Sequence, residues 1–166
     1  MMSLADLVVW WPRSEPVLAR ATTGDCEDLA AIHAASFHRG WGAEDLATML
    51  RDPAVVAHVA RRRTTAPAGG FILSRIAADE AEILTVATAP RLRGRGYGGR
   101  LVAAHLPDLM RAGVRRLFLE VEAENAPALK LYERAGFVPI GRRKGYYRTA
   151  TGTADAVTMR RDLPAI

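Results

Sequence analysis

A glycine- and arginine-rich segment, residues 91–99, is the part of the sequence whose residue types most clearly suggest a chemistry. Glycine allows backbone N–H groups to turn towards an anion and to approach it closely. A predicted helix follows directly, and its N-terminus adds partial positive charge. We therefore expect a phosphate or pyrophosphate to bind here, at Arg93, Gly94, Arg95, Gly96, Tyr97, Gly98 and Gly99.

The same glycines fit a dinucleotide fingerprint, which is the first alternative. Gly94, Gly96 and Gly99 match G-x-G-x-x-G, and an acidic residue, Glu120, lies 21 residues further on. That fingerprint requires its first glycine directly after a strand. Here residues 89–93 intervene, and only 67 residues remain after Gly99, too few for the usual doubly wound arrangement. The spacing therefore disfavours a dinucleotide.

A second way to divide the segment is Arg93-x-x-Gly96-x-Gly98, which resembles the pyrophosphate-binding motif of the GNAT acetyltransferases. Residues 83–90 look like the strand that leads into this motif. Residues 125–137, N-A-P-A-L-K-L-Y-E-R-A-G-F, are similar to a later and more specific motif of the family. The resemblance covers residues 17–163. Within the family it is strongest to RimI-type ribosomal-protein alanine N-acetyltransferases, through the stretches at 119–121, 131–133 and 142–147.

This resemblance implies transfer of the acetyl group of acetyl-CoA to the N-terminal α-amine of a protein. The expected acceptor is an N-terminal alanine of a small-subunit ribosomal protein, and the expected location is the cytoplasm, with no membrane and no specific nucleic acid as partner. A GNAT enzyme acting on a small-molecule amine or a lysine side chain is the alternative. A basic nucleic-acid-binding or CoA-sensing domain without catalysis is a third hypothesis.

Two side chains are the expected catalytic residues. An α-amine has a pKa of about 7.7–8.0, so a carboxylate can remove its proton near neutral pH. The resemblance assigns this role to Glu120, which otherwise is a solvated acid or a partner of Arg115 or Arg116. It assigns Tyr132 as the general acid for the departing thiolate, where the alternative is a tyrosine packed at the edge of the core.

The resemblance also implies the remaining contacts. Backbone groups of Val86, Ala87 and Thr88 are expected to pair with the pantetheine arm, as in strand addition. Asn125 is expected to contact the cofactor and to cap a helix. The expected acceptor contacts are Trp41, Tyr146 and Tyr147, although these tyrosines could equally pack a hairpin.

Alternating strand and helix patterns predict an α/β protein. The resemblance implies the GNAT fold, a single mixed, mainly antiparallel sheet that is flanked by helices and split at the cofactor strand. Residues 17–166 are expected to form this domain, after an N-terminal extension over residues 1–16. Pro107 should kink the helix that follows the glycines. A long basic loop is expected over residues 141–153. Strands are expected at 17–21, 55–60, 70–76, 83–88, 116–121, 137–140 and 156–161.

Composition narrows the remaining possibilities. The chain has 166 residues, a formal net charge of +5 and one cysteine, Cys26, so an intrachain disulfide is excluded. The positive charge fits either an anionic ligand or a solvated, arginine-rich surface. The four histidines lack metal-ligand spacing, so no metal is expected. The apolar stretch at residues 7–11 is too short to span a bilayer.

Overall fold

The computed structural model describes residues 15–165. These residues form a seven-stranded sheet, four α-helices and two short 3-10 helices, at Thr23–Asp25 and Pro90–Leu92. The predicted α/β class is confirmed. The α-helices and strands are β1 Val17–Arg20, α1 Cys26–Ala34, α2 Ala43–Arg51, β2 Val55–Arg61, β3 Ala68–Ala77, β4 Glu80–Thr88, α3 Tyr97–Arg111, β5 Arg116–Glu122, α4 Ala126–Arg134, β6 Val138–Thr149 and β7 Gly152–Asp162.

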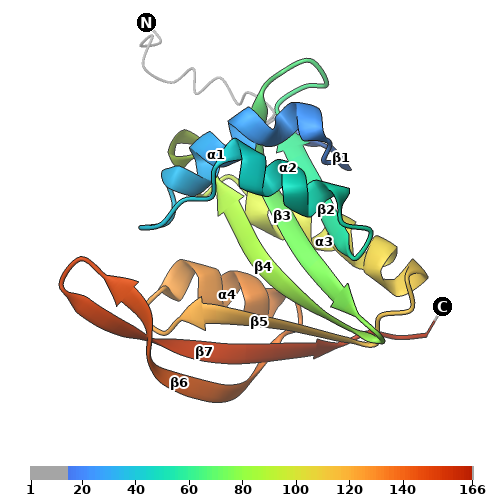
Figure 1. Ribbon diagram of the computed structural model, residues 1–166. Coiled ribbons are helices and arrows are strands. Elements are labelled where there is room, and N and C mark those ends of the chain that lie inside the picture. Colours follow the sequence, from blue (N-terminus) through green and yellow to red (C-terminus); the bar gives the residue numbers. More distant parts are fainter. Residues whose placement is uncertain (1–14, 166) are drawn as a thin grey trace, which may run out of the picture.

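The sheet has the strand order β1-β2-β3-β4-β5-β7-β6. Among the described strands only β4 and β5 run parallel; every other neighbouring pair is antiparallel. A parallel connection needs a crossover, and α3 supplies it. In Figure 1 the sheet consequently has two parts, β1–β4 above and β5, β7 and β6 below, which meet at the right and separate towards the left.

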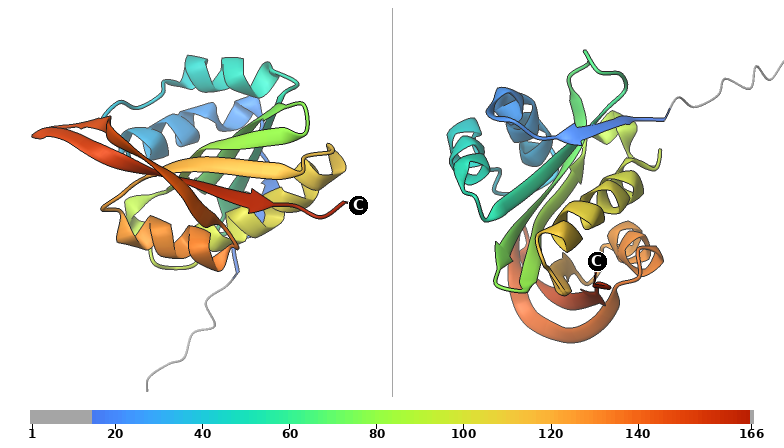
Figure 2. Two further views of the ribbon diagram at one scale, coloured as in Figure 1. Left: turned by 90° about the horizontal axis from the view of Figure 1, so that it is seen from below. Right: turned by 90° about the vertical axis from the view of Figure 1, so that its right-hand side faces the viewer.

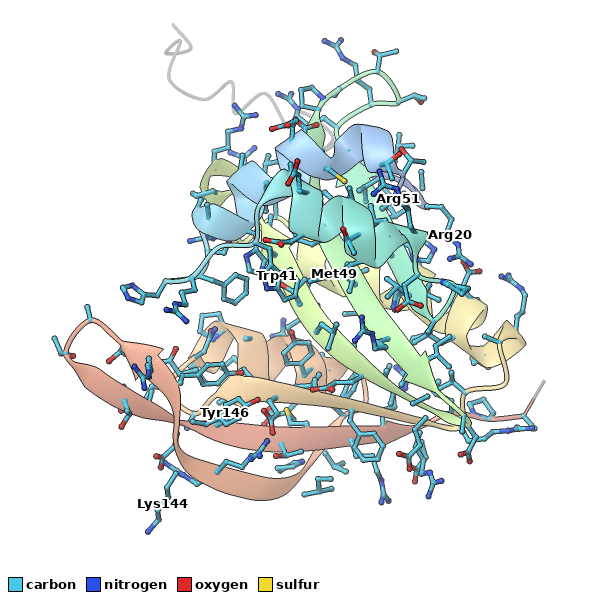
Figure 3. The ribbon with its side chains drawn as sticks, viewed as in Figure 1. Arg20, Trp41, Met49, Arg51, Lys144 and Tyr146 are labelled. Carbon is cyan, nitrogen blue, oxygen red and sulfur yellow. The ribbon has the colours of Figure 1, made fainter. Side chains whose placement is uncertain are left out.

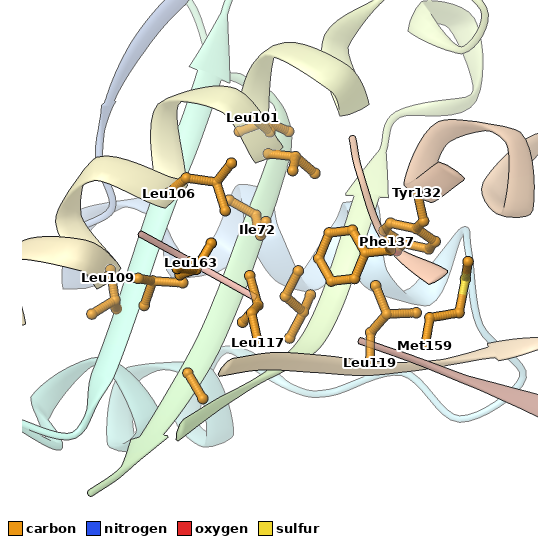
Figure 4. Close-up of a cluster of buried hydrophobic side chains, with 14 of the residues drawn as sticks. Ile72, Leu101, Leu106, Leu109, Leu117, Leu119, Tyr132, Phe137, Met159 and Leu163 are labelled. Carbon is orange, nitrogen blue, oxygen red and sulfur yellow. The ribbon is translucent and has the colours of Figure 1, made fainter. Parts of the chain in front are cut away.

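Helices cover both faces of the sheet. The right-hand view of Figure 2 shows α1 and α2 on one side and α3 and α4 on the other. Strand β3 therefore carries seven consecutive buried residues from Ala68 to Ser74, because neither of its faces meets solvent there. Two hydrophobic clusters result, one under each pair of helices. Figure 4 shows the cluster beneath α3 and α4, in which Ile72 of β3 lies between Leu101 of α3 and Leu117 of β5.

Helix α3 begins at Tyr97, two residues before the predicted end of the glycine segment. Gly96 is its N-terminal cap, so Tyr97, Gly98 and Gly99 belong to the first helical turn instead of to the loop. The helix runs on to Arg111 through Pro107 without interruption. Pro107 is exposed, so water can bind the carbonyl that its missing N–H leaves free.

The prediction of a long basic loop over residues 141–153 is wrong. Strands β6 and β7 form a hairpin in which Thr149 pairs with Gly152, leaving only a tight turn between them. Strand β6 is an edge strand and is exposed along most of its length, so its residues show no buried face and no alternation. A sequence pattern based on alternation cannot identify such a strand.

The predicted extension, residues 1–16, falls mainly on residues 1–14, which lie outside the described part of the chain. The last two residues of that range contact the domain: Glu15 pairs with Arg100 at 2.6 Å, and Pro16 is buried. Within residues 15–165, no helix combines the length and the apolar character that crossing a membrane requires.

Candidate active site

Strands β4 and β5 separate halfway along their length. Their ladder ends at the pair Ile83 and Leu119. On the other side of β4, its pairing with β3 skips Leu84, which is therefore a bulge at the point of separation. Beyond it, residues 84–88 have no partner strand on the β5 side. The predicted split at this strand is confirmed, and it leaves backbone N–H and C=O groups available to a ligand.

A cavity of about 1030 Å³ occupies this split. Its floor comes from β4 and β5, and α4 contributes one side. The segment between α1 and α2 and the β6–β7 hairpin form the other walls. The residues proposed from sequence that line it are Trp41, Val86, Glu120, Asn125, Tyr132, Tyr146 and Tyr147.

The glycine segment lies where β4 ends, and it is not part of that lining. Gly94 and Gly96 have φ angles of 69° and 82°, and the space where a side chain would stand is empty. Such a backbone, directly before the N-terminus of α3, suits an anion. Ala87 and Thr88 connect the cavity to this segment.

Two predicted members of the phosphate site have other roles for their side chains. Tyr97 is 6% exposed and belongs to the core beneath α3. A Cβ on Gly98 would stand 2.6 Å from Leu131 Cδ1, so this glycine allows α3 and α4 to pack closely. The backbone N–H groups of this first helical turn are what the two residues can offer to an anion.

Arg93 contacts protein carbonyl groups. Its guanidinium donates hydrogen bonds to the carbonyl oxygens of Thr88 and Ala35 and to Ser36 Oγ, each at 3.2 Å. It thereby joins the end of β4 to the segment that follows α1. Arg95 is exposed and forms no ion pair within residues 15–165, so its guanidinium can add a full positive charge to the expected phosphate site.

Glu120 lies one residue beyond the last β4–β5 pair. Its side chain is 13% exposed, and its Oε1 accepts a hydrogen bond from Arg143 Nη1 at 2.6 Å. The alternative partners named from sequence do not reach it, because Arg116 pairs with Asp79 and Glu80. The sequence did not identify Arg143 as the partner of Glu120, because the two residues are 23 positions apart and no local spacing pattern links them.

Tyr132 lies on α4 and is 8% exposed, with its ring against Phe137 at a centroid distance of 5.7 Å. Burial raises its pKa above the ordinary value. The hydroxyl therefore stays protonated throughout the working range of pH and can donate a hydrogen bond into the cavity. Asn125 precedes the same helix and caps it by accepting a hydrogen bond from the Ala128 N–H at 3.2 Å.

The wall after α1 is built around a histidine that sequence analysis did not assign. His33 stacks on Trp41 at a centroid distance of 4.3 Å, and its Nδ1 accepts a hydrogen bond from the Trp41 N–H at 3.0 Å. The Phe37 ring also contacts the His33 ring, at a centroid distance of 4.4 Å. Burial lowers the pKa of His33 to about 4, which keeps the ring neutral and able to accept.

The opposite wall holds the two adjacent tyrosines of β6. The Tyr147 hydroxyl donates a hydrogen bond to the Glu120 carbonyl oxygen at 3.0 Å, and burial raises the pKa of Tyr147 to about 12. Tyr146 is 47% exposed, and its interaction with the Glu120 carboxylate raises its pKa. In Figure 3 the labelled Tyr146 points into the gap between the two parts of the sheet.

One buried oxygen in the cavity lining lacks a partner. Thr85 Oγ1, on β4, forms no hydrogen bond within the described residues. Unpaired buried hydroxyls are uncommon in native proteins and call for an explanation, such as a ligand that completes them. Within the described residues no three potential ligand side chains gather around a metal site.

The sequence of the chain matches a known protein family over a segment that contains most of this site. The model of the acetyltransferase (GNAT) family matches residues 26–137, which include both the glycine segment and the proposed catalytic residues. The chain belongs to the GNAT acetyltransferase family.

Among curated proteins, the chain is similar to the ribosomal protein bS18-alanine N-acetyltransferase of Salmonella typhimurium, with 39% identity over 89 residues that cover 54% of this chain and 60% of that protein. It is 44% identical to N-alpha-acetyltransferase RimI of Mycobacterium tuberculosis over 95 residues, 57% of each chain. The chain thus spans about 60% of the length of these relatives.

Solved GNAT structures share the fold over nearly the whole chain. The ribosomal-protein-S18-alanine N-acetyltransferase from Escherichia coli superposes with a TM-score of 0.81 at 25% identity, covering 91% of this chain and 96% of that one. Arabidopsis thaliana NAA60 in complex with acetyl-CoA gives a TM-score of 0.77 at 21% identity, covering 89% and 98%. The predicted GNAT fold is confirmed by these neighbours.

Proposed function

We propose that residues 17–166 form an acetyl-CoA-dependent N-acetyltransferase that acetylates the N-terminal α-amine of a protein. The observation that carries this proposal is the cavity at the β4–β5 split, which Glu120 lines from β5 and Tyr132 lines from α4. Membership of the GNAT family and the relatives named as alanine N-acetyltransferases support it.

The residues present fit the cosubstrate, which supplies an acetyl thioester when bound. The backbone around Gly94 and Gly96, with the first N–H groups of α3, suits its pyrophosphate. The free edge of β4 over Val86, Ala87 and Thr88 suits its amide-bearing arm, because an extended chain can add to a strand edge. The solved GNAT neighbour with bound acetyl-CoA supports this assignment.

Glu120 is the proposed general base. An ammonium group has no lone pair for attack, so the acceptor amine must lose a proton first. Glu120 accepts this proton directly or through a water molecule. An α-amine, with its pKa of about 7.7–8.0, is deprotonated by a carboxylate far more easily than a lysine amine, whose pKa is about 10.4.

Tyr132 is the proposed donor to the departing sulfur. An ordinary thiol has a pKa of about 8.5, and an ordinary tyrosine about 10, so the two are nearly matched. Burial raises the pKa of Tyr132 further, which favours a hydrogen bond to the thiolate over early loss of the proton. Desolvation also raises the pKa of the developing thiolate, so the proton passes to the sulfur late in the step, and the tyrosinate that remains regains a proton from solvent afterwards.

The acceptor enters between the Trp41 wall and the β6–β7 hairpin. Aromatic walls at Trp41, Tyr146 and Tyr147 suit the backbone and first side chains of a peptide. The similarity to alanine N-acetyltransferases supports an N-terminal alanine of a ribosomal protein as the acceptor.

A thiol-release assay with acetyl-CoA tests this function over a panel of peptides that differ at residue one and in length. We expect release with free α-amines, a preference for N-terminal alanine, and a requirement for several residues beyond it. The same peptides with a blocked α-amine are the control. Binding of acetyl-CoA without thiol release on any acceptor contradicts the proposal.

A further inference from the structure

Arg143 forms an ion pair with Glu120, the proposed base that lines the cavity. Its Nη1 lies 2.6 Å from Glu120 Oε1, while its guanidinium carbon lies 4.6 Å from the centre of the Tyr146 ring. The Glu120 side chain is 13% exposed, whereas that of Arg143 is 58% exposed. The carboxylate is thus sheltered, and its cationic partner extends towards solvent.

A bulge in β6 lies directly beside Arg143, which reaches Glu120 from this strand. The pairing of β6 with β7 is regular from Gly141 to Arg143, is interrupted after Arg143, and resumes at Tyr147. Between them Gly145 takes a φ of 61°, and Asp155 anchors the turn by accepting hydrogen bonds from the Gly145 N–H and from Arg142 Nε, both at 2.9 Å. Asp155 thus anchors the backbone of the bulge, while Glu120 and Tyr146 contact the guanidinium group of Arg143.

We propose that Arg143 occupies the place of the acceptor cation on Glu120 and yields it to the ammonium group of an incoming protein N-terminus. This inference rests on the proposed role of Glu120. The guanidinium and the α-ammonium are both cations that donate hydrogen bonds to a carboxylate. Side by side on one sheltered carboxylate the two cations repel each other, so each lowers the affinity of Glu120 for the other.

The acceptor and the acetylated product differ in their ability to displace Arg143 from Glu120. An ion pair with one exposed partner contributes little, so the acceptor can displace Arg143 at small cost. The acetylated product is an uncharged amide and cannot compete for the carboxylate. Arg143 therefore returns to Glu120 after transfer, and it favours release of the product over rebinding.

The experiment measures binding in the absence of transfer. Calorimetric titration with the peptide amide Ala-Ser-Gly-Gly is carried out with CoA in place of acetyl-CoA, on the full chain and on Arg143→Gln. The N-acetylated form of the same peptide serves as the uncharged probe. Lys144→Gln is the matched control, since it removes one positive charge from the same bulge; Figure 3 shows Lys144 directed away from the gap.

We expect Arg143→Gln to bind the free-amine peptide about two- to fivefold more tightly than the native chain and Lys144→Gln do. Binding of the N-acetylated peptide should not change, and Arg143→Lys should restore native affinity. A residue that merely orients Glu120 gives the opposite result, an unchanged or weaker affinity with a lower kcat. No gain in free-amine affinity, including no measurable binding to any variant, overturns the proposal.

Failure of the proposed function is recognised separately. It appears as an absence of thiol release from acetyl-CoA, and the calorimetric experiment requires no release. A gain in affinity without transfer would retain Arg143 as a competitor for Glu120 while removing the catalytic role of that carboxylate.

Discussion

Two regions of the molecule gather ionisable side chains within hydrogen-bonding distance, and only one of them is open. Beneath α3, His58 Nδ1 and His105 Nδ1 lie 2.8 Å apart, and His105 Nε2 lies 2.7 Å from Ser74 Oγ. His58 Nε2 continues the chain to Asp108 at 3.2 Å, and Asp108 pairs with Arg20 at 2.6 Å. We call these five residues the α3 network.

The α3 network has the residue types of a hydrolase triad, yet it is sealed. His105 and Ser74 are both 0% exposed, so no substrate can reach the serine. Each buried member has a partner, as expected for polar groups that stabilise a core. At the β4–β5 split, in contrast, Thr85 Oγ1 lacks a partner and the edge of β4 is free.

The difference shows what distinguishes a site from a structural network. Serine, histidine and aspartate at hydrogen-bonding distance are not sufficient, because access and unpaired groups are also needed. The ion pair at Glu120 makes the same point, since its partner Arg143 is largely exposed to solvent, unlike the buried members of the α3 network.

The largest expected effect concerns Glu120. Glu120→Gln should lower kcat/KM about 10²- to 10⁴-fold at pH 7, which is the range for loss of a general base. The loss should shrink at high pH, where the acceptor amine is already neutral. Steady-state kinetics from pH 6.5 to pH 9.5 measure both.

Glu122→Gln is the control for Glu120, because Glu122 is the other acid of β5 that lines the cavity. It should keep most of the activity. A full rate for Glu120→Gln at pH 7, or equal losses in the two variants, would remove Glu120 from the role of base and weaken the contrast with the α3 network.

The second effect is a pH dependence of stability that arises from the α3 network. Burial lowers the pKa of His105 to about 3 and also lowers that of His58. A histidine in the unfolded chain has a pKa of about 6.5, so the unfolded state binds protons first as the pH falls. The contribution of His105 is therefore complete above pH 6.5 and is lost below it, by about 2 kcal/mol at pH 5.

Chemical denaturation of the native chain and of His105→Gln at pH 7.5 and pH 5 measures this loss. At pH 7.5 the native chain should be more stable than His105→Gln, and this difference in unfolding free energy should narrow by about 2 kcal/mol at pH 5. His38→Gln changes a histidine at an exposed position, so its difference from the native chain should be the same at both pH values. If the difference in stability between the native chain and His105→Gln did not depend on pH, His105 would not have the lowered pKa that burial of the α3 network implies.

The smallest effects come from two buried hydroxyl groups. Ser74→Ala leaves the Nε2 atom of His105 without its partner, which should cost at least about 1 kcal/mol of unfolding free energy. Thr85→Val removes an oxygen that has no partner, so stability should be unchanged or slightly higher. Thermal unfolding of both variants provides the measurement, and a large loss for Thr85→Val would mean that this hydroxyl is satisfied.

Local patterns were sufficient to predict much of the fold. An apolar run of strand length identified residues 83–88 of β4, and the cap at Asn125 marked the start of α4. Glu120 on β5 and Tyr132 on α4 both line the cavity, and the family resemblance had assigned both. The separation of β4 from β5 followed from the family resemblance alone.

The missing features depend on contacts between distant segments. Strand β6 has no buried face, so the hairpin that places Arg143 was interpreted as a loop. His33 carried no metal-ligand spacing and so received no role, and its stack on Trp41 depends on the segment that joins two helices. The α3 network joins β1, β2, β3 and α3, and no spacing in the sequence marks it.

The central claim, that the open cleft transfers acetyl to an α-amine, is tested most directly by locating the acetyl group on one peptide. Ala-Ser-Gly-Lys-Gly amide offers an α-amine and a lysine amine, and tandem mass spectrometry after incubation with acetyl-CoA distinguishes them. At pH 7.5 the α-amine is neutral roughly a few hundred times more often than the lysine. We predict acetylation of the α-amine by the native chain and little by Glu120→Gln. Acetyl on the lysine alone, or an unmodified peptide in the presence of bound acetyl-CoA, would contradict the claim.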